Sequence, residues 1–307
     1  MGLNHARTIA TGPHTALSVV IDPDEQRGHA AADQYGARYS PSLDDLADVD
    51  AAVVAAPTEH HRDLALAVIE AGLPLLVEKP VCPSLEETER VVAASAAAGT
   101  PLMCGLLERF NPAVLVAMAM LDEPRYVRAE RHSPYAPRIK TGVAWDLLVH
   151  DVDLVVRAFG SHHPVEVDVK VGEFNPQSLP GAEDVVEATM RFEGGGIASA
   201  SASRIGQRKV RSMVIHELDR MIEVDLLRRG VTAYRHTTIE GDEGHSGFRQ
   251  MTEMEVPEII GAEPLATQLE HFVSLVKGKV DADVERASIL PAHQVVDQAL
   301  AVTRARG

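Results

Sequence analysis

The spacing of apolar residues in the first third of the chain predicts strands that alternate with helices. Residues 15–22 form a short apolar, β-branched run ending at Asp22, and residues 24–36 have the pattern of a helix that stops at a glycine. The same alternation continues through strands at 50–56, 74–77 and 101–106 and helices at 59–71 and 84–98. This order is typical of a parallel sheet with helices on both faces. We therefore expect a doubly wound α/β domain over residues 1–106.

After about residue 106 the pattern changes to strands in which apolar and polar residues alternate. The expected strands are 124–133, 164–172, 184–193, 196–204, 209–216, 220–227 and 230–236. Helical spacing appears at 145–159, 265–277 and 287–305. We expect a C-terminal α+β domain at 107–290 with a mostly antiparallel, open-faced sheet, and a helix at 291–307 that packs back on the first domain.

Composition narrows the class of protein. The chain has 307 residues, 45% of them apolar, which is enough for two globular domains. Its formal charge of −16 leaves no basic patch for nucleic acid or an anionic membrane, so neither is an expected partner. Two cysteines, Cys82 and Cys104, cannot form a disulfide framework. With no apolar run of about 20 residues and no signal peptide, the expected location is the cytoplasm.

Three local signals suggest chemistry. Asp22 ends a strand and lies 20 residues after Gly2, where nucleotide-binding domains place an acid for ribose hydroxyls; an ordinary turn aspartate is the alternative. Glu78-Lys79-Pro80 follows a buried strand, so the lysine emerges at the ligand-binding edge of the sheet, unless it is a solvated turn residue. Asp146 and His150 share one helix face, which suits a carboxylate that orients a proton-transferring imidazole, or a simple surface pair. The spacing of His and Cys residues predicts no metal site.

Together these segments resemble the Gfo/Idh/MocA family of NAD(P)-dependent oxidoreductases, which act mainly on sugars and cyclitols. Residues 1–7 look like the family's helix after its glycine-rich loop, with Gly2 as the third glycine. Residues 57–61 resemble its Pro-Asn-x-x-His segment, with Thr58 in place of Asn and His61 in the His position. Residues 76–80 match its Glu-Lys-Pro motif, and Asp146 with His150 match its Asp-x-x-x-His helix. The N-terminal domain is thereby expected to be of Rossmann type.

The resemblance implies hydride transfer between a nicotinamide and a hydroxyl-bearing carbon. His150 would be the base, Lys79 would hold and polarise the oxygen, and Asp146 would fix His150 or bind a neighbouring hydroxyl. The implied cofactor contacts are Gly2, Asp22, Pro57, Thr58, His61, Glu78 and Lys79. A carboxylate at Asp22 favours NAD because it repels a 2′-phosphate, while the nearby Arg27 leaves room for NADP.

The substrate expected from the resemblance is a sugar or nucleotide sugar. Residues 105–112 resemble a subset of the family that acts on hexoses, including nucleotide-linked amino sugars. Arg109 would neutralise an anionic group and Asn111 would bind a hydroxyl, although both residues equally suit capping of the following helix. Arg138 and Lys140 are candidates for binding a diphosphate.

The chain departs from the family pattern at its start. Gly2 matches the third glycine of the G-x-G-x-x-G fingerprint. The first two glycines and the strand before them are lacking in the given sequence. We expect the true start to lie about 8–12 residues upstream, enough for one strand and a Gly-x-Gly turn, because the absence of that strand would leave two buried strand edges unpaired.

Two other functions compete with a sugar dehydrogenase. A non-catalytic nucleotide- or sugar-sensing protein of the same fold would explain the absent glycines but not the Lys79, Asp146 and His150 set. An imine or biliverdin-type reductase would not need the Asp-His pair.

The open face of the predicted sheet suggests self-association. Met190, Val214 and Ile222 on that face would be covered by a second subunit. A homodimer or homotetramer is the expected state.

Overall fold

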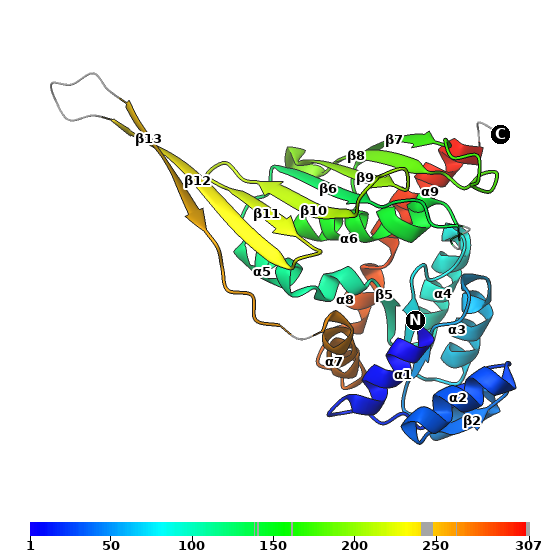
Figure 1. Cartoon of the computed structure of the whole chain (residues 1–307). Coiled ribbons are helices and arrows are strands. Elements are labelled where there is room, and N and C mark those ends of the chain that lie inside the picture. The colour runs from blue at the N-terminus through cyan, green and yellow to red at the C-terminus, as the bar shows by residue number, and fades with distance from the viewer. Residues whose placement is uncertain (138, 140, 161, 241–247, 262, 305–307) are drawn as a thin grey trace. The chain divides into compact units, whose positions relative to one another are not determined.

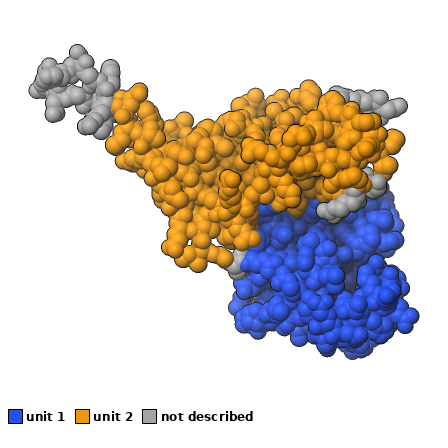
Figure 2. Space-filling view, viewed as in Figure 1, with its two compact units in different colours: residues 1–110, 262–293 blue, residues 111–261, 294–307 orange. Residues whose placement is uncertain are grey.

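The computed structural model describes residues 1–137, 139, 141–160, 162–240, 248–261 and 263–304 (Figure 1). The chain forms two compact units, coloured separately in Figure 2. Unit 1 comprises Met1–Phe110 and Ala262–His293, and unit 2 comprises Asn111–Gly261 and Gln294–Gly307. The division differs from the expected boundaries at 106 and 290, because the segment after the long sheet returns to unit 1 and the last residues cluster with unit 2.

Unit 1 contains the alternating strands and helices that the apolar pattern predicts. Its helices are α1 (Gly2–Thr11), α2 (Glu25–Tyr35), α3 (His61–Glu70), α4 (Leu85–Ala98), α7 (Pro264–Val276) and α8 (Ala282–Ala287). Its strands are β1 (Val19–Ile21), β2 (Arg38–Ser40), β3 (Ala52–Val54), β4 (Leu75–Glu78) and β5 (Leu102–Gly105). The predicted start and stop of α4 are confirmed, since the Ser84 hydroxyl accepts from the Glu87 amide at 3.2 Å and Gly99 adopts φ 66°.

The parallel sheet of unit 1 is in two pieces. β1 pairs with β2, and β3, β4 and β5 pair in that order, all in parallel. Every residue of β4 and β5 is buried, whereas β1 is only half-buried along its length. Within residues 1–110, β1 and β3 therefore each pair on one side only.

An apolar core lies on one side of the β3–β4–β5 sheet. It contains Leu76 and Met103 of the sheet together with Leu269, Phe272 and Leu275 of α7. The returning helix α7 thus contributes about as many core side chains as the sheet it covers, which explains why this late segment belongs to unit 1.

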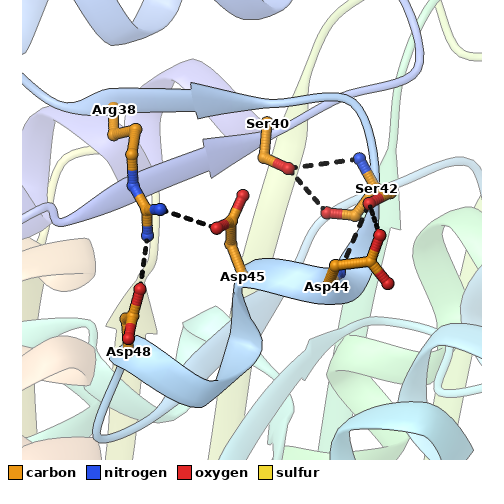
Figure 3. Close-up of polar contacts among 6 residues, drawn as sticks. All are labelled: Arg38, Ser40, Ser42, Asp44, Asp45 and Asp48. Carbon is orange, nitrogen blue, oxygen red and sulfur yellow. Dashed lines mark hydrogen bonds and ion pairs between the residues drawn. The ribbon is translucent and has the colours of Figure 1, made fainter.

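Several short elements of unit 1 were not predicted from the sequence, among them α8, β2 and the 3₁₀ helix η1 (Leu43–Asp48), which follows β2. Figure 3 shows the Arg38 guanidinium between two carboxylates of η1, with Nη1 2.6 Å from Asp45 Oδ1 and Nη2 3.1 Å from Asp48 Oδ2. Ser42 caps η1 by accepting from the Asp44 amide. Polar contacts rather than apolar periodicity hold this segment, so periodicity gave no signal for it.

Unit 2 is built on an eight-stranded sheet in the order β13-β12-β11-β10-β6-β9-β8-β7. Its strands are β6 (Tyr126–His132), β7 (Glu166–Gly172), β8 (Val185–Arg191), β9 (Ile197–Ser203), β10 (Val210–His216), β11 (Met221–Asp225), β12 (Gly230–Glu240) and β13 (Phe248–Glu255). All neighbours are antiparallel except β6 and β9. Together with unit 1, this confirms the predicted fold class.

Helices cover one face of this sheet. They include α5 (Pro112–Met120), which contacts β11 and β12, and α6 (Val149–Ala158), which contacts β6 and β9. The last helix, α9 (Leu290–Arg304), begins in unit 1 and continues in unit 2. The prediction that Met190 and Ile222 lie on the open face is wrong, because they are 2% and 0% exposed on the covered face. Alternation of apolar residues shows that a strand has two faces but not which of them receives the helices.

Candidate active site

Asp22 lies directly after β1 and is held by Arg27 of α2. The Arg27 Nε donates to Asp22 Oδ2 and its Nη2 donates to Asp22 Oδ1, both at 2.8 Å. The hydrogen bonds from Arg27 hold the pKa of the Asp22 carboxyl below its usual range. The Asp22 side chain keeps 24% of its surface exposed, so an ionised carboxylate faces solvent at the end of the strand. Such a group can accept from ribose hydroxyls.

The start of α1 offers a second feature suited to NAD. Met1 occupies the N-cap position and makes no side-chain cap hydrogen bond, and residues 1–4 are exposed. A Cβ placed at Gly2 would meet no atom within 4 Å, so the space beside Gly2 is open. Because amides at a helix N-terminus attract anions, this turn can hold a pyrophosphate. The residues present at β1 and α1 thus fit a dinucleotide.

Glu78 and Lys79 lie at the carboxyl end of β4. Glu78 is buried, and its Oε1 lies 2.7 Å from Nε2 of His5, a buried residue of α1. Lys79 is half-buried between two buried neighbours, Glu78 and Pro80, and the Lys79–Pro80 peptide bond is cis. The lysine is the first residue after β4 that reaches solvent, as expected for a ligand-contacting group at this edge of a parallel sheet.

Two histidines fix the loop that follows Lys79. The ring of His61 is 1% exposed, with Nδ1 2.9 Å from the Pro80 carbonyl oxygen and Nε2 2.8 Å from that of Ala56. Nε2 of His293 accepts from the Val81 amide at 3.3 Å. His61 was expected to bind cofactor; the structure places it between the loops that follow β3 and β4. Of the neighbouring expected contacts, Pro57 is exposed and Thr58 is half-buried in the 3₁₀ helix η2 (Thr58–His60).

Asp146 and His150 lie on the helical segment of unit 2. Asp146 belongs to a π-helical turn, η4 (Ala144–Leu148), which runs directly into α6, where His150 lies. From Leu147 to Val156, His150 is the single residue that is not buried. Asp146, just before this stretch, is also half-buried. A π-turn inside a helix is rare and frequently marks a functional site.

Buried arginines from the sheet hold this helix. Arg204, just after β9, donates from Nη2 to Asp146 Oδ2 at 2.8 Å. Arg131 of β6 forms a bidentate ion pair with Asp151, the residue after His150. The buried carboxylate of Glu183 accepts from the Ala144 amide at 2.7 Å. These residues and His5 were not predicted from the sequence, because their partners lie between 20 and 73 positions away and no local pattern connects them.

The proposed substrate residues have other partners. Arg109 is 4% exposed in unit 1, and its Nη1 donates to the Ser288 hydroxyl at 2.8 Å. Asn111 caps α5 by accepting from the Ala113 amide at 3.1 Å, and its Nδ2 donates to the Leu226 carbonyl. Asn111 thus has the helix-capping role that the sequence offered beside substrate binding. Arg138 and Lys140 lie outside the described residues.

Among the described residues, no group of three or more His, Cys, Asp or Glu side chains is placed to hold a metal ion. In the same part of the chain, no helix has the length and apolar character needed to cross a membrane.

The chain is similar to known dehydrogenases over most of its length. UDP-N-acetylglucosamine 3-dehydrogenase of Acidithiobacillus ferrooxidans is 30% identical over 279 residues, which cover 90% of this chain and 85% of that protein. A solved structure of that enzyme superposes with a TM-score of 0.82 at 28% identity, over 97% of this chain and 95% of the other. Inositol 2-dehydrogenase of Corynebacterium glutamicum is 30% identical over 210 residues, covering 64% of this chain and 61% of its own.

Family matches cover both units. Residues 1–106 match the oxidoreductase family with an NAD-binding Rossmann fold, and residues 114–222 match the GFO/IDH/MocA C-terminal domain. The predicted family and the predicted nicotinamide cofactor are confirmed. The chain belongs to the GFO/IDH/MocA family of NAD-binding oxidoreductases.

Proposed function

We propose that this protein is an NAD(P)-dependent dehydrogenase that transfers a hydride between the nicotinamide and a hydroxyl- or keto-bearing carbon of a nucleotide sugar. The full-length similarity to a UDP-N-acetylglucosamine 3-dehydrogenase supports a nucleotide-linked hexose as the substrate class. The shorter match to an inositol dehydrogenase makes a cyclitol the second candidate. Since these relatives are dehydrogenases, a non-catalytic sensor is not favoured.

The observation that carries the catalytic assignment is the partial exposure of His150. It is the one residue from Leu147 to Val156 that is not buried. An imidazole is the side chain best suited to exchange a proton near neutral pH. His150 would therefore take the proton of the substrate hydroxyl, with Asp146 helping to orient it.

Lys79 would hold and polarise the same oxygen. This assignment rests on the Glu78-Lys79-Pro80 resemblance and on the position of Lys79 at the carboxyl end of β4. Asp22 would bind the adenosine ribose and the first turn of α1 the pyrophosphate, while the bound NAD supplies the hydride acceptor. Glu78 and His61 would support the loops around Lys79, because both are buried and engaged by protein groups.

Arg109 and Asn111 are not part of the proposed active site. Their hydrogen-bonding groups bind other parts of the protein within their own units. We propose that they support the segments that follow β5.

The proposed oligomeric state is a homodimer or homotetramer. The face of the unit 2 sheet opposite α5 and α6 carries partly exposed apolar side chains, including Tyr126 and Ile197, which are paired neighbours on β6 and β9. Light scattering after size exclusion at micromolar concentration tests this, and a purely monomeric protein would contradict it. The cytoplasm remains the proposed location, since both cysteines are buried and unbridged.

The decisive experiment is a substrate panel followed by two substitutions. NAD reduction at 340 nm is measured with UDP-N-acetylglucosamine, UDP-glucose and myo-inositol, and NADH affinity is measured by fluorescence. We expect turnover with a nucleotide sugar, and we expect His150→Asn and Lys79→Ala each to lower kcat by about 10²–10⁴-fold with little change in NADH affinity. Turnover in both variants within threefold of the unmodified chain would remove the assigned mechanism.

A further inference from the structure

Arg204 links η4, the helical turn that continues into α6, to the sheet of unit 2. Its Nη2 donates to Asp146 Oδ2 at 2.8 Å, and its Nη1 donates to the Thr141 carbonyl oxygen. The residue is 4% exposed, whereas the Asp146 side chain is 26% exposed. One oxygen of the carboxylate therefore faces a buried cation, while the group as a whole still reaches solvent.

The backbone around Arg204 is fixed by its neighbours in the fold. Its amide donates to the Asp184 carbonyl at 2.8 Å, so the residue after β9 is anchored to the residue before β8. The Asp184 carboxylate in turn accepts from the amides of Phe174 and Asn175, both at 2.7 Å. Arg204 thus has a rigid base, which a side chain needs if it is to hold another group in one orientation.

Glu183 fixes the same helix start from a second direction. Its backbone carbonyl accepts from the Val143 amide at 3.0 Å, and its Oε1 accepts from the Ala144 amide at 2.7 Å. A Cβ at Gly142 would lie 2.1–2.2 Å from the three atoms of the Glu183 carboxyl group, so only glycine allows this approach. The turn before Asp146 is therefore held in place independently of the Arg204 contact.

We propose that Arg204 is a positioning residue for the reaction: it orients the Asp146 carboxylate, and through Asp146 it sets the orientation of His150. The inference rests on the proposed function, in which Asp146 and His150 act on the substrate. Arg204 needs no contact with substrate for this role. A fork-shaped guanidinium that bonds one acceptor with each terminal nitrogen restricts the carboxylate more than a lysine ammonium would.

This role makes a prediction that a structural role does not. If Arg204 acts only through Asp146, then removing Arg204 costs nothing further once Asp146 has been changed to Asn. If Arg204 merely stabilises the fold, the two substitutions lower kcat independently or leave kcat unchanged for the folded fraction.

The test uses the full chain with Arg204→Met, Arg204→Lys, Asp146→Asn and the Arg204→Met/Asp146→Asn double variant. Arg191→Met is the matched control, because Arg191 pairs with Glu166 at 3.1 Å on an exposed part of the same sheet. We expect Arg204→Met to lower kcat by about 10–100-fold with the NAD KM within twofold, and Arg204→Lys to recover part of that loss. The double variant should be no slower than Asp146→Asn.

A second readout does not depend on activity. Urea unfolding is measured for the double-mutant cycle, which consists of the unmodified chain, Arg204→Met, Asp146→Asn and the double variant. We expect Arg204 and Asp146 to be coupled by about fivefold or more in the unfolding equilibrium constant. Coupling below twofold, or a kcat of Arg204→Met within twofold of the unmodified chain, would overturn the proposal. If the unmodified chain turns over no sugar in the panel, the proposed function fails on its own, and the unfolding cycle still decides whether Arg204 holds Asp146.

Discussion

The Arg131 guanidinium and the Asp151 carboxylate meet as a bidentate pair inside unit 2. Nε lies 2.8 Å from Oδ2 and Nη2 lies 2.9 Å from Oδ1, with the two side chains 2% and 0% exposed. Because Arg131 is on β6 and Asp151 follows His150 on α6, this pair fixes how α6 is rotated on the sheet. It thereby keeps His150 on the side of the helix that reaches solvent.

Breaking this pair should cost more than any surface substitution in unit 2. We expect Arg131→Met or Asp151→Asn to lower the free energy of unfolding by about 3–5 kcal/mol, because each leaves a buried charge without the opposite charge that compensates it. Arg128→Met is the control: its 3.7 Å pair with Glu130 is exposed and should contribute less than about 1 kcal/mol. Urea unfolding measures all three, and a loss below 1 kcal/mol for both buried variants would contradict the prediction.

Glu183 should make stability depend on pH. Burial raises the pKa of its carboxyl above the ordinary value of 4.5. A carboxyl with a raised pKa in the folded state stabilises the fold below its unfolded pKa, and this contribution is lost as the pH rises through the folded pKa. Glu183→Gln keeps an oxygen for the Ala144 amide but cannot ionise.

The melting temperatures of the unmodified chain and Glu183→Gln should therefore diverge with pH. We expect the variant to gain stability relative to the unmodified chain as the pH rises above about 4.5. A difference that stays constant, or that moves in the opposite direction, would show that the folded pKa of Glu183 is not raised.

Cys82 should be inert in the folded protein. It is 0% exposed, and burial raises the pKa of its thiol to about 12. At pH 8 we expect iodoacetamide to label both cysteines at least about a hundredfold more slowly than after unfolding in urea, since the thiolate is the reactive form. Intact mass resolves the number of labels, and rapid single labelling of the native chain would contradict the buried position of at least one cysteine.

Asp22 should govern the choice between NAD and NADP. Its ionised carboxylate can accept from the 2′-hydroxyl of NAD and repels a 2′-phosphate. We expect Asp22→Ser to weaken NADH binding by about 10–100-fold and to reduce discrimination against NADPH.

Arg27→Ala provides the complementary variant. It removes the guanidinium that pairs with Asp22 and should weaken NADPH binding while changing NADH binding less than threefold. Fluorescence titrations with both cofactors report the ratio. Equal preference in the unmodified chain and Asp22→Ser would remove the assigned role of Asp22.

Local sequence determined the elements and motifs that depend on residues close together. Ser84 and Gly99 bound α4 as predicted, and Asp22 and Lys79 lie at the ends of β1 and β4 because a strand pattern specifies where a strand stops. The i and i+4 spacing predicts Asp146 and His150 on one side of a helix, and both residues lie on one continuous helical segment. These features follow from the backbone geometry of a few consecutive residues.

Only the tertiary structure decided which partners hold these groups. Arg204 meets Asp146 across 58 positions, and His5 meets Glu78 across 73, through packing that no local period encodes. The faces of the unit 2 strands were assigned by the helices that cover them, which is why Met190 and Ile222 proved to be core residues. A hydrogen bond or a buried face depends on which distant segments the fold brings within a few ångströms. Periodicity shows only which residues within one segment face solvent and which do not.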